Sequence, residues 1–121
     1  MERTAVKAYR AMRYLVYAAQ HQQVMTYQEF CKRVGVSSRE IGPVASYIRD
    51  EFCLPRKLPL LNLLIVKTQD EPPPTSFFVN HSLHMSKTER ATEFRKALRK
   101  VYRYQDWDAL LTELEIAPLP V

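Results

Sequence analysis

The stretch TYQEFCKRVGVSSREI, residues 26–41, contains two helix-start signals on either side of a single glycine. Thr26 is followed three residues later by Glu29, and Ser37 is followed in the same way by Glu40. Each pair has the form of a capping box, in which the hydroxyl and the carboxylate satisfy backbone N–H groups at the start of a helix. The stretch therefore predicts two helices that begin close together in the chain.

A short turn around Gly35 separates these two helices, which we predict over residues 26–34 and 38–52. Glycine readily adopts the left-handed conformation in which many helices end. Two helices joined by so short a turn form a helix-turn-helix. In DNA-binding motifs of this kind the first turn of the second helix faces the bases. Here that turn carries Ser38 and Arg39.

An amphipathic helix is predicted over residues 3–21, ahead of the helix-turn-helix. Its apolar residues recur at three- and four-residue spacing and form one face. The cations Arg3, Lys7, Arg10 and Arg13 repeat with the same period on another face. We interpret this cationic stripe as solvated, and a face that contacts phosphates is the alternative.

Two further helices are predicted near the C-terminal end of the sequence. Ser86 and Glu89 form a third capping box at the start of helix 86–104, and Asp106 can cap a helix over 106–115. Helix 86–104 is the most basic segment of the chain, which predicts a surface for phosphates or for an acidic protein; the alternative is that its charge only aids solubility. Its cations are Arg90, Arg95, Lys96, Arg99, Lys100 and Arg103.

A β-hairpin is predicted at about residues 60–80. Leu60–Val66 and Ser76–Asn80 have the composition of strands, and the loop between them contains three consecutive prolines. A hairpin that follows a helix-turn-helix has the form of a wing. We therefore expect an α+β fold, mainly helical, that is winged-helix-like with C-terminal helices and forms a single domain over residues 1–121.

The composition of the 121 residues is 46% hydrophobic and 26% charged, which is ordinary for a globular protein. Eighteen Lys and Arg against thirteen Asp and Glu give a formal net charge of +5, which favours a polyanionic partner such as nucleic acid. The longest apolar run, residues 58–66, is too short to span a membrane, and no secretory signal is visible. With only two cysteines, the sequence predicts a cytoplasmic protein with no membrane partner.

The middle of the sequence resembles the C-terminal, DNA-binding domain of alkylguanine-DNA alkyltransferases and of the catalytically inactive alkyltransferase-like proteins. The resemblance covers roughly residues 24–66. In that family a Thr-Tyr-x-Glu-Leu helix start precedes a recognition helix with Arg-x-Val-Gly and then a Leu-Pro-Ile-Leu strand. The matching residues here are Thr26–Phe30, Gly35, Arg39–Gly42 and Leu58–Leu61.

The resemblance implies roles for two residues in DNA binding. Tyr27 would correspond to the tyrosine that presses on the backbone at a flipped nucleotide, and Arg39 to the arginine that fills the vacated stack. Unstacking a base costs a few kcal/mol, and an inserted side chain offsets part of that cost. The structural alternatives are that Tyr27 covers the core of the helix-turn-helix and that Arg39 is a solvated first-turn residue.

The sequence departs from the family at the active site. The family places Pro-Cys-His-Arg where this chain has residues 62–66, NLLIV, which include no nucleophile and no activating histidine. Cys31 and Cys53 lie elsewhere, and we interpret both as small buried hydrophobes. The pair His81 and His84 lacks the further ligands that a zinc site needs. We therefore expect no enzymatic activity, no metal and no cofactor.

Two functions of different classes fit these patterns. The leading hypothesis is a non-enzymatic DNA-binding protein in which Ser38 and Arg39 enter a groove and the helix 86–104 extends the contact. The alternative is a small protein-interaction module, such as a phage or mobile-element inhibitor of a nucleic-acid-handling complex. In the leading hypothesis the phosphates are contacted by Lys32, Arg33 and Arg49.

Overall fold

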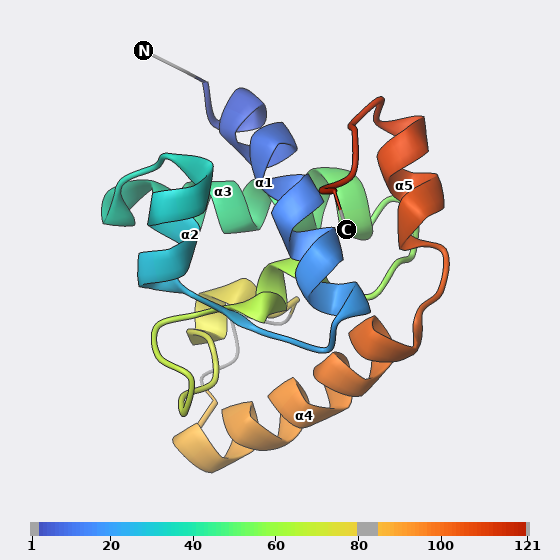
Figure 1. Cartoon of the computed structure of the whole chain (residues 1–121). Coiled ribbons are helices and arrows are strands. Elements are labelled where there is room, and N and C mark those ends of the chain that lie inside the picture. The colour runs from blue at the N-terminus through green and yellow to red at the C-terminus, as the bar shows by residue number, and fades with distance from the viewer. Residues whose placement is uncertain (1–2, 80–84, 121) are drawn as a thin grey trace.

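Helix α1 (Thr4–Gln20) lies at the centre of the structure, a computed structural model that describes residues 3–79 and 85–120 (Figure 1). It packs against helices from both halves of the chain. Small side chains, with Ala8, Ala11 and Ala19 all buried, let the neighbouring helices approach its axis closely. The predicted helix 3–21 is confirmed, and α1 provides the surface on which the rest of the fold is assembled.

The two predicted helices of the helix-turn-helix are present as α2 (Tyr27–Val34) and α3 (Ser38–Tyr47), and α1 packs against both. The Thr26 hydroxyl accepts a hydrogen bond from the backbone N–H of Glu29 at 3.2 Å, and the Thr26 N–H donates to the Glu29 carboxylate at 3.1 Å. Gly35 ends α2 with a left-handed φ of 78°. The local signals of the sequence therefore set both the start and the end of α2.

The helical path of α3 continues through a π-helical turn, η1 (Ile48–Cys53), so the predicted helix 38–52 is confirmed in extent. Its predicted buried face is also confirmed, since Ile41, Val44, Ala45 and Ile48 are all buried. This face holds α3 against α1, and it leaves the first turn of α3 at the surface.

The predicted β-hairpin is wrong for the described part of residues 60–80. Leu61–Leu64 form a 3₁₀ turn, η2, and Thr75–Phe77 form another, η3. Strand β2 (Ile65–Val66) pairs instead with β1 (Met25–Thr26), in a parallel two-stranded sheet. A hairpin strand in a wing exposes one face, whereas every residue from 61 to 66 is buried. The described residues therefore contain no wing; Asn80, the end of the predicted returning strand, lies outside them.

Helices α4 (Lys87–Arg103) and α5 (Trp107–Glu113) confirm the last two predicted helices. The capping box of Ser86 and Glu89 is formed, whereas the predicted cap by Asp106 is wrong because its side chain makes no cap hydrogen bond. Figure 1 shows α4 along one edge of the molecule, where it packs on η2 and α1. Trp107 is buried, and its indole N–H donates to the carbonyl of Val101 at 3.0 Å, which ties α5 to the end of α4.

The observed architecture is thus mainly helical with a minimal parallel sheet. Among the described residues, none of the helices combines the length and the apolar character that crossing a bilayer requires.

Candidate nucleic-acid interface

The first turn of α3 and the adjacent end of α2 form an exposed cationic surface. Ser38 and Arg39 lie on α3, and Lys32 and Arg33 lie on the last turn of α2; all four are exposed. None of the three cations forms an ion pair or hydrogen bond with a residue that the structure describes. The structure therefore brings together four of the predicted site residues, with positive charge that is free to meet a ligand.

The nearby carboxylates leave this charge largely uncompensated. Glu29 is engaged in the capping box of α2. Glu40 accepts a backbone hydrogen bond from Ser37 at 2.8 Å and forms an ion pair with Lys7 of α1. Both carboxylates are thus occupied by contacts that hold the helix-turn-helix together.

The cationic stripe of α1 is not solvated, so our interpretation of it is wrong for three of its four members. Lys7 pairs with Glu40, and its side chain is only 12% exposed. Arg10 donates to the carbonyl of Val34 at 2.6 Å, and Arg13 donates to a C-terminal carbonyl, that of Pro118, at 3.5 Å. These cations tie α1 to neighbouring segments, and of the stripe only Arg3 is exposed.

Tyr27 lies at the start of α2 with its ring partly buried against the hydrophobic core. Burial raises the pKa of its hydroxyl above the ordinary value of 10.0. This placement agrees with the structural alternative, in which Tyr27 covers the core. Its contact with DNA stays a prediction.

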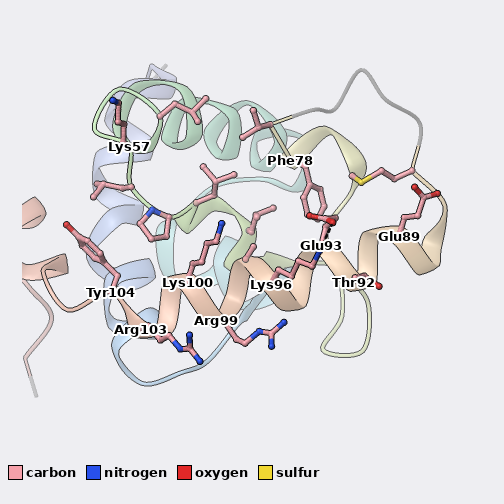
Figure 2. A pocket seen from close by; sticks show the side chains of 18 of the residues that line it. Lys57, Phe78, Glu89, Thr92, Glu93, Lys96, Arg99, Lys100, Arg103 and Tyr104 are labelled. Carbon is pink, nitrogen blue, oxygen red and sulfur yellow. Dashed lines mark ion pairs between the residues drawn. The ribbon is translucent and has the colours of Figure 1, made fainter.

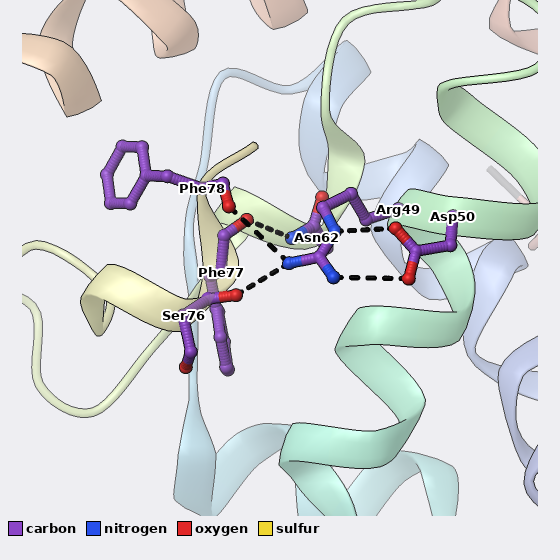
Figure 3. A network of polar contacts seen from close by, with 6 residues as sticks. All are labelled: Arg49, Asp50, Asn62, Ser76, Phe77 and Phe78. Atoms are coloured by element: carbon purple, nitrogen blue, oxygen red, sulfur yellow. Dashed lines mark hydrogen bonds and ion pairs between the residues drawn. The ribbon is translucent and has the colours of Figure 1, made fainter. Parts of the chain in front are cut away.

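Arg49 was predicted to contact phosphates, and this prediction is wrong because the residue is buried. Its guanidinium donates to the carbonyl of Ser76 at 2.6 Å and to that of Phe78 at 3.5 Å (Figure 3). It also forms a two-pronged ion pair with Asp50, at 2.8 and 3.1 Å. These four contacts engage all three guanidinium nitrogens, so Arg49 belongs to the framework and not to a binding surface.

Asn62 is a buried polar side chain, as Arg49 is. The sequence reading did not single it out as a site residue. It is 0% exposed, and its amide donates to the carbonyl of Phe77 at 2.8 Å (Figure 3). Its Oδ1 has no hydrogen-bond partner among the described residues. A lone asparagine within an apolar run is the signal that could have identified it, because buried polar groups require partners.

No reactive side chain stands where the alkyltransferase family carries its cysteine. Residues 61–66 are buried, and the first of them form the turn η2. Of the two thiols, Cys53 is 0% exposed, and burial raises its pKa to about 11, so at neutral pH it is protonated and unreactive. The interpretation of both cysteines as small buried hydrophobes is therefore confirmed for Cys53 only, since Cys31 is partly exposed.

A groove of about 1390 Å³ runs between α4 and the segment from Leu54 to Leu60. The lining of this groove includes Lys96, Arg99, Lys100 and Arg103. Figure 2 shows Lys100 directed toward the facing segment and Lys96 directed toward Glu93, whereas the guanidinium groups of Arg99 and Arg103 lie on the other side of α4. The predicted basic helix thus presents two cationic surfaces. Its predicted site residues Arg95, Lys96, Arg99, Lys100 and Arg103 are all exposed.

The structure does not bring α4 next to the helix-turn-helix. Figure 1 shows α4 on the opposite edge of the molecule from α2 and α3, with η2 and the small sheet between them. The sequence reading also missed Lys57, which lies on the segment opposite α4 and contributes to the lining of the groove. Its position near the C-terminal half of α4 depends on the path of the chain after η1, for which the sequence has no local signal.

No group of metal-ligating side chains occurs in the described ranges; His81 and His84 lie outside them. In comparisons with known proteins, no protein-family model, curated protein or solved structure matches this chain.

Proposed function

We propose that the protein binds DNA without catalysis, through the exposed surface of α2 and α3. The observation that carries this proposal is the first turn of α3, where Arg39 is exposed and has no partner among the described residues. Lys32 and Arg33, on the last turn of α2, supply further positive charge for phosphate contacts. The capping contacts of α2 and α3 hold this surface in place before any ligand arrives.

The outer face of α3 also carries small side chains, which would let the helix approach a DNA groove closely. Ser38, Gly42 and Ser46 follow one another at four-residue spacing, so they lie on one side of the helix. A side chain at Gly42 would meet nothing within 4 Å, which means that this side of the helix faces open space. Small residues let a backbone approach its ligand, and Arg39 is then the long side chain that reaches the bases.

The absence of catalysis is proposed on the chemistry of the described residues. The position that would carry the nucleophile in the resembling family is occupied by buried aliphatic residues and Asn62. Cys53 is buried and protonated at neutral pH. Neither this segment nor Cys53 therefore offers an accessible thiolate that could accept an alkyl group.

The test is a comparison of Arg39→Ala with Arg3→Ala in DNA-binding titrations on duplex, single-stranded and mismatched DNA. Arg3 is an exposed cation beyond the start of α1, so it is a matched control for charge alone. We expect Arg39→Ala to weaken binding by about 1–3 kcal/mol, and Arg3→Ala to have a much smaller effect. Equal and negligible effects of the two substitutions, or no binding by the unaltered chain at low salt, would contradict the proposal.

A further inference from the structure

The groove beside α4 has an apolar floor that is open to solvent. Two of the most exposed large hydrophobic side chains of the described chain, Leu54 at 40% and Val79 at 49%, line it. Leu58, Leu60 and Ala97 add further partly exposed apolar surface. The volume of about 1390 Å³ exceeds that of most small-molecule pockets, which span roughly 300–1,000 Å³. The groove is therefore large enough for a segment of polypeptide.

Cations border this floor at the end nearer the C-terminus of α4. Lys100 projects from α4 and Lys57 from the facing segment, and neither has an ion-pair partner among the described residues (Figure 2). Lys96 stands between the two ends and is 3.5 Å from Glu93. Glu89 and Glu93 line the other end, where Glu89 is held by the capping box. One end of the groove thus has lysines without ion-pair partners among the described residues, and the other end has carboxylates that already contact Ser86 or Lys96.

The turn that carries Lys57 is held in a fixed position. Arg56 donates to the carbonyls of Glu51 at 3.1 Å and Phe52 at 3.2 Å, and it forms an ion pair with Glu113 of α5. Lys57 itself has a φ of 57°, a left-handed conformation that glycine would adopt at lower cost. The contacts of Arg56 thus fix the turn on which Lys57 contributes to the lining of the groove.

We propose that this groove binds an acidic amphipathic segment of a partner protein. Aliphatic side chains of the segment would cover Leu54 and its apolar neighbours, and its carboxylates would pair with Lys57, Lys96 and Lys100. An amphipathic helix with anchors at three- and four-residue spacing is the usual form of such a ligand. The carboxylates of the segment gather toward the end that lies beside Lys100, because Glu89 and Glu93 repel them at the other end.

A nucleic acid fits this groove less well than such a peptide. A phosphate backbone would pair with the lysines but would leave the aliphatic floor uncovered. Bases stack on flat aromatic faces, and the two aromatic rings that line the groove are occupied: Phe78 is 7% exposed, and Tyr104 packs edge-on against Trp107 at 4.6 Å. Charge and apolar surface together therefore favour a peptide that carries both acidic and aliphatic groups.

The test is selection from a displayed library of random peptides of about 16 residues, roughly four helical turns, with the full chain as bait. Binders are then synthesised and titrated by fluorescence anisotropy against four variants that circular dichroism shows to be folded. Lys57→Glu with Lys100→Glu reverses charge inside the groove, and Leu54→Gln removes apolar floor without changing charge. Arg95→Glu is a control for charge on α4, because it reverses one exposed charge that does not line the groove, and Leu54→Gln tests the groove with no change of charge. The fourth variant is Arg39→Ala.

We expect the selected peptides to be rich in acidic and aliphatic residues, and their affinity to fall by at least about tenfold in both groove variants. Arg95→Glu and Arg39→Ala should leave it nearly unchanged. Selection of no peptide, selection of basic or neutral peptides, or binding that is insensitive to both groove variants would overturn the proposal. Loss of DNA binding in the groove double variant, together with no peptide binding, would assign the groove to nucleic acid. Because Arg39→Ala affects DNA binding alone, failure of this proposal is distinguishable from failure of the proposed DNA-binding function.

Discussion

Arg49 and Asn62 are two buried polar side chains that hold the same segment of chain, residues 76–78, against the core (Figure 3). They do so through its backbone carbonyls, three groups that would otherwise be left without donors in the fold. A buried carbonyl without a donor is costly, so each of these side chains has more influence on stability than its surface area suggests. At the scale of the residue, a side chain predicted to bind a ligand has instead become part of the framework.

We expect Arg49→Met to lower the free energy of unfolding by about 1–3 kcal/mol, because it removes the donor to the carbonyls of Ser76 and Phe78. Asp50 remains half exposed and can be solvated, which limits the loss. The measurement is urea unfolding followed by circular dichroism. Arg33→Met is the control: Arg33 is exposed without such contacts, so its substitution should change stability by less than about 0.5 kcal/mol. Equal effects of the two substitutions would contradict the framework role of Arg49.

The N-cap hydrogen bond that the sequence predicts is formed at the start of α4 and is absent at the start of α5. The hydroxyl of Ser86 accepts a hydrogen bond from the backbone N–H of Glu89 at 3.1 Å, at the start of α4. Asp106, in the corresponding position before α5, makes no such contact. The start of α5 depends instead on the buried ring of Trp107. At the scale of the element, a polar N-cap residue starts α4 through a hydrogen bond, whereas α5 starts where Trp107 packs into the core.

Ser86→Ala should therefore destabilise the protein more than Asp106→Ala. Loss of an N-cap typically costs about 1 kcal/mol, and of these two residues only Ser86 makes a cap hydrogen bond. Urea unfolding of both variants at neutral pH gives the comparison. A loss of stability in Asp106→Ala as large as that in Ser86→Ala would show that Asp106 caps α5 in solution.

The same cap predicts a pH dependence. Hydrogen bonds from the backbone and side chain of Ser86 lower the pKa of Glu89 below its ordinary value of 4.5. A carboxylate whose pKa is lower in the folded state contributes stability above its unfolded pKa, and this contribution is lost as the pH falls through the folded pKa. We expect Ser86→Ala to raise the pKa of Glu89 toward 4.5, as measured by NMR titration of its side-chain carboxyl. The backbone N–H of residue 86 remains in the variant, so an unchanged pKa would mean that the Ser86 hydroxyl does not act on Glu89.

The whole molecule presents its positive charge on surfaces that face different ways. Lys32, Arg33 and Arg39 lie on the helix-turn-helix, while the cations of α4 lie along the opposite edge (Figure 1). A straight duplex bound to α3 would therefore meet the first surface and not the second. The net charge of +5 favours approach of any polyanion, and the arrangement of the charges decides where it binds.

Two charge reversals of equal size test this arrangement. Lys32→Glu with Arg33→Glu and Arg99→Glu with Arg103→Glu each lower the formal net charge by four, from +5 to +1. We expect the first pair to weaken DNA binding and to make the salt dependence shallower by roughly two, since two phosphate contacts are lost. The second pair should leave the salt slope nearly unchanged. A shallower slope in the second pair would show that DNA extends to α4, as the sequence analysis expected.

Local signals in the sequence determined the helices of this protein. Capping boxes and the turn glycine are interactions between neighbours in the chain, and they set the starts of α2, α3 and α4 and the end of α2. The spacing of apolar residues indicated α1, and packing of Trp107 sets the start of α5. The tertiary structure decided the rest. Leu61–Val66 is apolar apart from Asn62 and carries no alternating pattern. Burial of the whole segment, with pairing of Ile65–Val66 to Met25–Thr26, makes it a 3₁₀ turn and a short strand where a wing was predicted. Tertiary packing also decided which cations are available to a ligand, because Arg10 and Arg49 donate to backbone carbonyls of distant segments. The groove beside α4 arises from segments that are far apart in the sequence, because a surface exists only once the chain has been packed around its core.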